Sequence, residues 1–179
     1  MKHFISRRNF LKAAGVTAAA SAMAAAVPQA SAGFLTGKDA AVTILYTNDV
    51  HTYIDNKSPK LTYAAIAAMK QGYVDEGKPV LLVDAGDHIQ GTAYGSMDDG
   101  ATIIELMNEA GYDIATPGNH EFDYGMARAK AIIKEADFPY VSCNWVDLRT
   151  GLRVLPAVKL FPAGGKWIAF VGITTPESF

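Results

Sequence analysis

The sequence has few cysteines and histidines, and it carries no strong excess of charge of either sign. Cys143 is the only cysteine, so the chain forms neither an internal disulfide nor a zinc cluster built on cysteines. The net charge is −2, and no basic stripe of the kind that binds nucleic acid occurs outside the N-terminal segment. The sequence also has no Walker phosphate loop and no dinucleotide-binding glycine fingerprint.

Long apolar runs are scarce as well, and the one clear example, residues 13–27, lies close to the N-terminus. It follows the twin-arginine segment Ser6–Lys12 and precedes the small residues Ala30–Ala32. This order predicts a twin-arginine signal peptide over residues 1–32, recognised by the export machinery and directing the protein to the periplasm or otherwise out of the cytoplasm. The run is too short and too rich in alanine for a stable membrane anchor. A helical N-terminal extension or an uncleaved anchor is the alternative.

Residues 33–179 alternate between apolar, strand-like segments and amphipathic, helix-like segments. Strands are predicted over Val42–Thr47, Val80–Val83, Tyr112–Thr116 and Phe138–Cys143, helices over Leu61–Tyr73, Ala101–Ala110 and Tyr124–Ala136, a glycine-rich loop over Gly86–Asp99, and a final hairpin from Arg153–Phe161 and Lys166–Ile173. This alternation predicts an α/β fold. In open α/β sheets, ligands bind beyond the carboxyl ends of the strands.

Polar clusters follow three of the predicted strands, and the first of them is Asp49–His51. Residues two apart on an extended backbone point the same way, so the Asp49 and His51 side chains are expected to converge. A carboxylate and an imidazole together suit a divalent transition metal. Taken alone, the motif is better explained by a capping aspartate and a surface histidine.

The second and third clusters contain Asp87 and Asn119. One carboxylate has enough lone pairs to bridge two cations, and two cations about 3.5–4 Å apart can clamp a phosphate and activate a water. Asn119 offers a neutral oxygen ligand. Ordinary turn roles are the alternative for both residues.

His120 and Asp123 lie three residues apart at a predicted helix start. The aspartate is expected to orient the imidazole and keep it protonated, so that it stabilises phosphoryl oxygens and protonates a leaving oxygen. A capping pair is the alternative. Glu121 is interpreted as a supporting or structural residue. His88 directly follows Asp87 and would point away from it, which favours a structural or surface role.

Taken together, the three clusters resemble the first signature blocks of calcineurin-like metallophosphatases. The similar segments are Asp49–His51, Gly86–Gly91 and Gly118–Glu121, and the longer forms Tyr46–His51, Gly118–Gly125 and Thr174–Glu177 are similar to the 5′-nucleotidase branch. The resemblance runs from about Val42 onward. It implies the N-terminal half of a four-layer α/β-β/α sandwich, in which two sheets are flanked by helices.

The resemblance also implies roles for individual residues. Asp49 and His51 would bind a first metal, Asp87 would bridge, Asn119 would bind a second metal and contact substrate, and His120 with Asp123 would form a catalytic dyad in which His120 also contacts substrate. The implied reaction is hydrolysis of nucleotide phosphoesters by a metal-activated water, with no covalent enzyme intermediate. The implied cofactors are two divalent ions, with zinc, manganese or iron equally compatible with such ligands.

The family pattern extends further than residues 33–179, which are expected to be an incomplete catalytic domain. A Gly-His-x-His block and a C-terminal nucleotide-binding domain belong to the pattern, and neither occurs before Phe179. The alternatives to nucleotide hydrolysis are a truncated, inactive fragment that binds metal or a partner weakly, and a related hydrolase of cyclic nucleotides, nucleotide sugars or thiosulfonates. Without its second half, the sheet is expected to expose apolar surface.

Overall fold

The computed structural model describes residues 40–54 and 62–175. The predicted signal peptide lies outside the described residues, as do the start of the first predicted helix at Leu61 and the end of the segment Thr174–Glu177.

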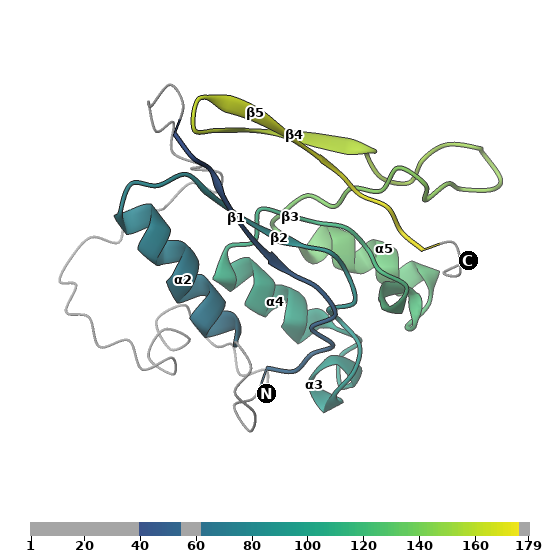
Figure 1. Ribbon diagram of the computed structural model, residues 1–179. Helices are drawn as coiled ribbons and strands as arrows, with labels where there is room; N and C mark the ends of the chain where they lie inside the picture. The colour runs from purple at the N-terminus through teal and green to yellow at the C-terminus, as the bar shows by residue number, and fades with distance from the viewer. Residues whose placement is uncertain (1–39, 55–61, 176–179) are drawn as a thin grey trace.

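A parallel sheet forms the centre of the described chain (Figure 1). Its strands are β1 (Thr43–Thr47), β2 (Val80–Asp84) and β3 (Ile114–Ala115), in the spatial order β1-β2-β3. The predicted α/β class and these three strands are therefore confirmed. The central strand β2 reads as an unbroken apolar run before its final aspartate, as expected for a strand covered on both faces. Its register aligns Thr47 with Asp84 and Asp84 with Ala115, so the carboxyl ends of all three strands meet at one edge.

Three helices lie on one side of this sheet in Figure 1, and each matches a predicted helix. Helix α2 (Tyr63–Asp75) begins after Thr62, whose hydroxyl accepts a hydrogen bond from the Ala65 backbone. Helix α4 (Ala101–Ala110) ends at Gly111, which adopts the left-handed conformation that closes many helices. Helix α5 spans Met126–Glu135. The apolar sides of these helices form the core with β2.

The predicted glycine-rich loop contains a short helix that the sequence pattern did not indicate. Helix α3 (Ala93–Ser96) begins after Thr92, whose hydroxyl accepts from the Tyr94 backbone N–H. Two glycines made this segment look like an irregular loop, but tertiary contacts stabilise the turn. Thr92 is held by Thr52, through a hydroxyl pair at 2.6 Å and a backbone N–H bond of 2.6 Å.

The predicted fourth strand, Phe138–Cys143, is largely wrong. Only a single parallel bridge, between Ala115 and Tyr140, joins this segment to the sheet within the described residues. The reason is visible in the backbone: the Val141 N–H still donates to Ala115, but the next two N–H groups donate to Pro156 and Gly172. The segment therefore leaves the sheet after one residue of pairing.

The last two strands, β4 (Val158–Ala163) and β5 (Lys166–Val171), form the predicted antiparallel hairpin. Gly164 and Gly165 both have positive φ, as a tight hairpin turn requires. In Figure 1 the hairpin lies on the side of the sheet opposite the helices. Several of its large apolar side chains are exposed, with Leu160 and Trp167 among them.

Candidate metal centre

The first polar loop follows β1 and brings Asp49 and His51 together, but not by the predicted route. Asp49, His51 and Thr52 have φ values of 53°, 47° and 57°, so the segment is left-handed rather than extended. The side chains still converge, with His51 Nε2 lying 3.7 Å from Asp49 Oδ1. The backbone is held in this unusual form because the Asp49 and His51 N–H groups donate to the carbonyls of Gly86 and Asp87.

The tautomer of His51 follows from its neighbour. His51 Nδ1 lies 3.1 Å from the carbonyl oxygen of Gln90, which can only accept, so Nδ1 carries a hydrogen. The lone pair of the neutral ring is therefore on Nε2, the nitrogen that faces Asp49. A backbone carbonyl that fixes the tautomer in this way is typical of histidines that bind metals.

The second loop carries Asp87, which also has positive φ, at 59°. Its Oδ1 accepts a 2.8 Å hydrogen bond from the backbone N–H of His120. Partial burial raises the pKa of Asp87, and the nearby carboxyl groups of Glu121 and Asp49 raise it further against the opposing effect of that hydrogen bond. Acidic groups are thus crowded together at this edge of the sheet.

The third loop is a 3₁₀ turn, η1 (His120–Phe122), and not the first turn of the following helix. Gly125 precedes helix α5 without a side-chain cap, so a capping role for His120 and Asp123 is not supported. His120 Nδ1 lies 2.8 Å from Asp123 Oδ2. This hydrogen bond raises the pKa of His120 above its ordinary value, with the surrounding carboxylates adding to the effect. Asn119, half-buried, immediately precedes the turn.

The three loops meet at one point. One donor atom each from His51, Asp87 and His120 lies within 4.8 Å of the other two, which is the spacing of a group that can hold a metal ion. The two imidazole rings are 5.0 Å apart and nearly perpendicular. The residues present suit a divalent metal because they combine nitrogen and oxygen donors with crowded acidic groups, Asp49 included, that a cation would neutralise.

His88 lies next to this centre, and the sequence left its role open between structural and surface. His88 is fully buried, so a surface role is wrong and the structural role is confirmed. Its Nδ1 lies 2.7 Å from Asp84 Oδ1, and its Nε2 lies 2.7 Å from the Tyr140 hydroxyl. Burial alone would lower the pKa of His88, but the carboxylates of Glu121 and Asp84 outweigh it and raise the pKa to about 9.

Asp84 was not singled out from the sequence, although it links the strand ends. It accepts hydrogen bonds from the Thr47 hydroxyl at 2.5 Å and from the Gly86 N–H at 2.8 Å, besides its contact with His88. The available signal was an aspartate ending an otherwise apolar, buried strand. Such a residue needs polar partners inside the protein.

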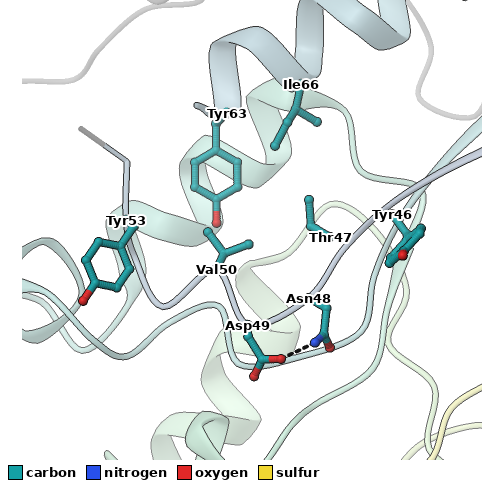
Figure 2. A pocket seen from close by; sticks show the side chains of 8 residues that line it. All are labelled: Tyr46, Thr47, Asn48, Asp49, Val50, Tyr53, Tyr63 and Ile66. Carbon is teal, nitrogen blue, oxygen red and sulfur yellow. Dashed lines mark hydrogen bonds between the residues drawn. The ribbon is translucent and has the colours of Figure 1, made fainter. Parts of the chain in front are cut away.

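A pocket adjoins the metal-binding edge, and Figure 2 shows how its lining side chains lie. The lining residues come from β1, the loop after it and helix α2: Tyr46, Thr47, Asn48, Asp49, Val50, Tyr53, Tyr63 and Ile66. Asn48 donates a side-chain hydrogen bond to Asp49, drawn as the dashed line in Figure 2. Asp49 therefore lines this pocket and also lies beside His51 of the metal-binding group.

Nitrogen and oxygen donors gathered beyond the carboxyl ends of a parallel sheet have the composition and place of a site for a divalent metal. The sequence matches the calcineurin-like phosphoesterase family over residues 42–176, and the chain belongs to this family. Members of this family are phosphoesterases that depend on divalent metals. The first residues match the twin-arginine translocation signal over residues 5–27, which indicates export across the membrane, to the periplasm in bacteria.

The relatives place the chain near 5′-nucleotidases. It is 34% identical to human 5′-nucleotidase over 155 residues, covering 76% of this chain and 27% of that protein. Among solved structures, a 5′-nucleotidase precursor from Thermus thermophilus matches with a TM-score of 0.67 and 29% identity, covering 76% of this chain and 29% of that one. The NAD nucleotidase of Haemophilus influenzae matches with a TM-score of 0.67 and 26% identity, covering 76% and 27%.

The chain thus spans about a quarter of the length of the curated relatives it matches. Within residues 40–54 and 62–175, no helix has both the length and the apolar character needed to cross a membrane.

Proposed function

We propose that the protein hydrolyses nucleotide phosphoesters outside the cytoplasm, in the manner of a 5′-nucleotidase, at a centre that holds two divalent metal ions. The observation that carries this proposal is the convergence of His51, Asp87 and His120 from three separate loops at the carboxyl edge of the sheet. His51 and Asp87 belong to the proposed ligand set, which Asp49 and Asn119 complete, whereas His120 has a separate catalytic role. Asp49 and His51 would hold one ion and Asn119 the other, with the Asp87 carboxylate contributing to both.

Metal ions bound there would polarise a phosphate and lower the pKa of a water. The chain's own residues bind and orient the rest. The Nε2 atom of His51 is the one available to a metal, because Nδ1 is hydrogen-bonded to the backbone carbonyl of Gln90. The backbone N–H of His120 holds one oxygen of Asp87 in place. The ligand atoms therefore have restricted orientations before any ligand binds.

His120 and Asp123 form the proposed catalytic pair. Asp123 fixes the ring by bonding to Nδ1, which leaves Nε2 to face the substrate. Because Asp123 raises the pKa of His120, the imidazole stays protonated closer to neutral pH than a free histidine. A protonated His120 stabilises charge on the phosphoryl oxygens and donates its proton to the leaving oxygen. Asn119 and His120 are also the proposed contacts to the substrate.

The proposed organisation is a signal peptide over residues 1–32 followed by metallophosphatase catalytic domain over residues 33–179. The related proteins named above are called 5′-nucleotidases and a NAD nucleotidase, which supports a nucleotide as the substrate class. The matched region is only about a quarter of those proteins, so several candidate substrates are compared by experiment.

The test is phosphate release from 5′-AMP by the purified exported protein, with manganese or zinc supplied. Hydrolysis of a cyclic nucleotide, a nucleotide sugar and a thiosulfonate, which frees no inorganic phosphate, is followed in parallel by chromatography of the products. We expect metal-dependent release that disappears in Asp87→Asn and persists in Asp113→Asn, a partly buried carboxylate that bonds Lys70 and the Leu82 backbone instead of the metal loops. Folded, metal-loaded protein that cleaves none of these compounds would overturn the proposal and favour a non-enzymatic role. Activity retained in Asp87→Asn would overturn the assigned centre.

A further inference from the structure

Glu121 is a carboxylate buried at 2% exposure within the same loop as His120. A buried carboxylate is costly to desolvate, so its partners indicate its role. All four hydrogen bonds described for it come from backbone N–H groups. Oε2 accepts from Asp87 at 2.8 Å and from Gly118 at 2.6 Å, and Oε1 accepts from His88 at 2.8 Å and from Ile89 at 3.3 Å.

These bonds join the second polar loop to the third. Oε2 alone bridges them, because Asp87 belongs to one loop and Gly118 to the other. The loops also touch backbone to backbone: a Cβ at Gly86 would lie 2.5 Å from the Gly118 nitrogen. A further bond joins the two loops, because the Asp87 carboxylate accepts a hydrogen bond from the His120 N–H. The result is a closed arrangement in which each loop holds the other.

His88 supports Glu121 from the buried side. Its Nδ1 lies 3.6 Å from Glu121 Oε1 and 2.7 Å from Asp84 Oδ1, so one imidazole faces two carboxylates. All three side chains are at most 3% exposed. Water therefore does not solvate these carboxylates, and the protein supplies their partners.

We propose that Glu121 is the positioning residue of the metal centre: it holds Asp87, in its left-handed conformation, at the angle from which the carboxylate meets His51 and His120. This inference rests on the proposed function for the role of Asp87 as a ligand. Glu121 does not touch metal or substrate. It acts through the backbone of residues 87–89 and 118. Its replacement should therefore loosen that backbone as well as weaken metal binding, whereas the replacement of a ligand should mainly weaken metal binding.

The variant Glu121→Gln keeps the shape of the side chain but replaces one acceptor oxygen with an NH₂ donor, which cannot accept from two of the four N–H groups. Two properties of the full exported protein are measured: amide hydrogen exchange in the peptide containing residues 86–90, and Mn²⁺ affinity of the metal-free protein by electron paramagnetic resonance. We expect faster exchange in that peptide and about 10–100-fold weaker Mn²⁺ binding. Asp113→Asn is the matched control, and it should leave both properties at wild-type values.

Glu121→Asp keeps the charge but shortens the reach by one methylene, so it should fall between Gln and the wild type. It also serves if the Gln variant does not fold. Exchange and Mn²⁺ affinity within twofold of the wild type in folded Glu121→Gln, or in Glu121→Asp where the Gln variant does not fold, would overturn the inference, as would an equal loss in Asp113→Asn. If the wild type binds Mn²⁺ but releases no phosphate, the proposed function fails while these measurements still decide the role of Glu121. If the wild type binds no Mn²⁺, the proposed centre fails, and hydrogen exchange alone decides whether Glu121 holds the loops.

Discussion

Replacing Gly118 with alanine tests the contact between the second and third loops at its tightest point. A Cβ at this position would lie 2.3 Å from Asp87 Oδ1, 2.7 Å from its Cγ and 2.8 Å from its backbone nitrogen. Non-bonded atoms attract at ~3.5–4.0 Å, so the carboxylate must move by ~1 Å. Because the backbone nitrogen of Asp87 is also too close, rotation of the side chain alone cannot relieve the clash. The loop itself must move.

Two magnitudes follow from this displacement. Forcing an extra carbon into a packed site costs roughly 1–3 kcal/mol of unfolding free energy. Distances from a metal to its ligands vary by only about 0.2 Å between sites. A 1 Å misplacement of a group in a reactive site can lower the reaction rate by about 100-fold. We therefore expect Gly118→Ala to lower the melting temperature by several degrees and to weaken Mn²⁺ binding by about two orders of magnitude.

Thermal unfolding and Mn²⁺ titration of the metal-free protein measure these two effects separately. Gly72→Ala is the matched control, because nothing lies within 4 Å of a Cβ at this position inside helix α2. It should stabilise the protein by about 0.5–1 kcal/mol, since alanine is the better helix former, and should leave metal affinity unchanged. Mn²⁺ affinity within twofold of the wild type in folded Gly118→Ala would refute the packing argument.

Three further predictions use charge and hydrogen bonding. Asp123→Asn should lower the pKa of His120, because the hydrogen-bonded carboxylate raises it, and the basic limb of the pH–rate profile should shift to lower pH. Asp113→Ala leaves the buried Leu82 N–H without its acceptor and should cost about 1–3 kcal/mol in urea unfolding, with metal affinity unaffected. Because the pKa of His88 is raised from 6.5 to about 9, its stabilising contribution is complete below pH 6.5 and is lost as the pH rises through 9, so unfolding free energies should fall over that interval in the wild type but not in His88→Gln.

The strands and helices with strong periodicity were predicted close to their observed bounds. Helix α4 matches its prediction because its apolar positions recur at helical spacing and Gly111 ends it. The segment Phe138–Cys143 was misassigned because local β-propensity does not reveal that its N–H groups find acceptors in residues 156 and 172. Helix α3 was missed because Thr52, distant in sequence, holds its first turn.

The residue types of the candidate centre, and their place after the strands, followed from the sequence alone, because parallel strands bring their carboxyl ends to one edge. Their geometry did not follow. The Asp49–His51 segment converges through positive φ values that non-glycine residues rarely adopt, and backbone hydrogen bonds to residues 86 and 87 stabilise them. The same holds for the buried network of Asp84, His88 and Glu121. Hydrogen bonds between residues more than 30 positions apart depend on how the chain packs, and local sequence patterns carry no record of that packing.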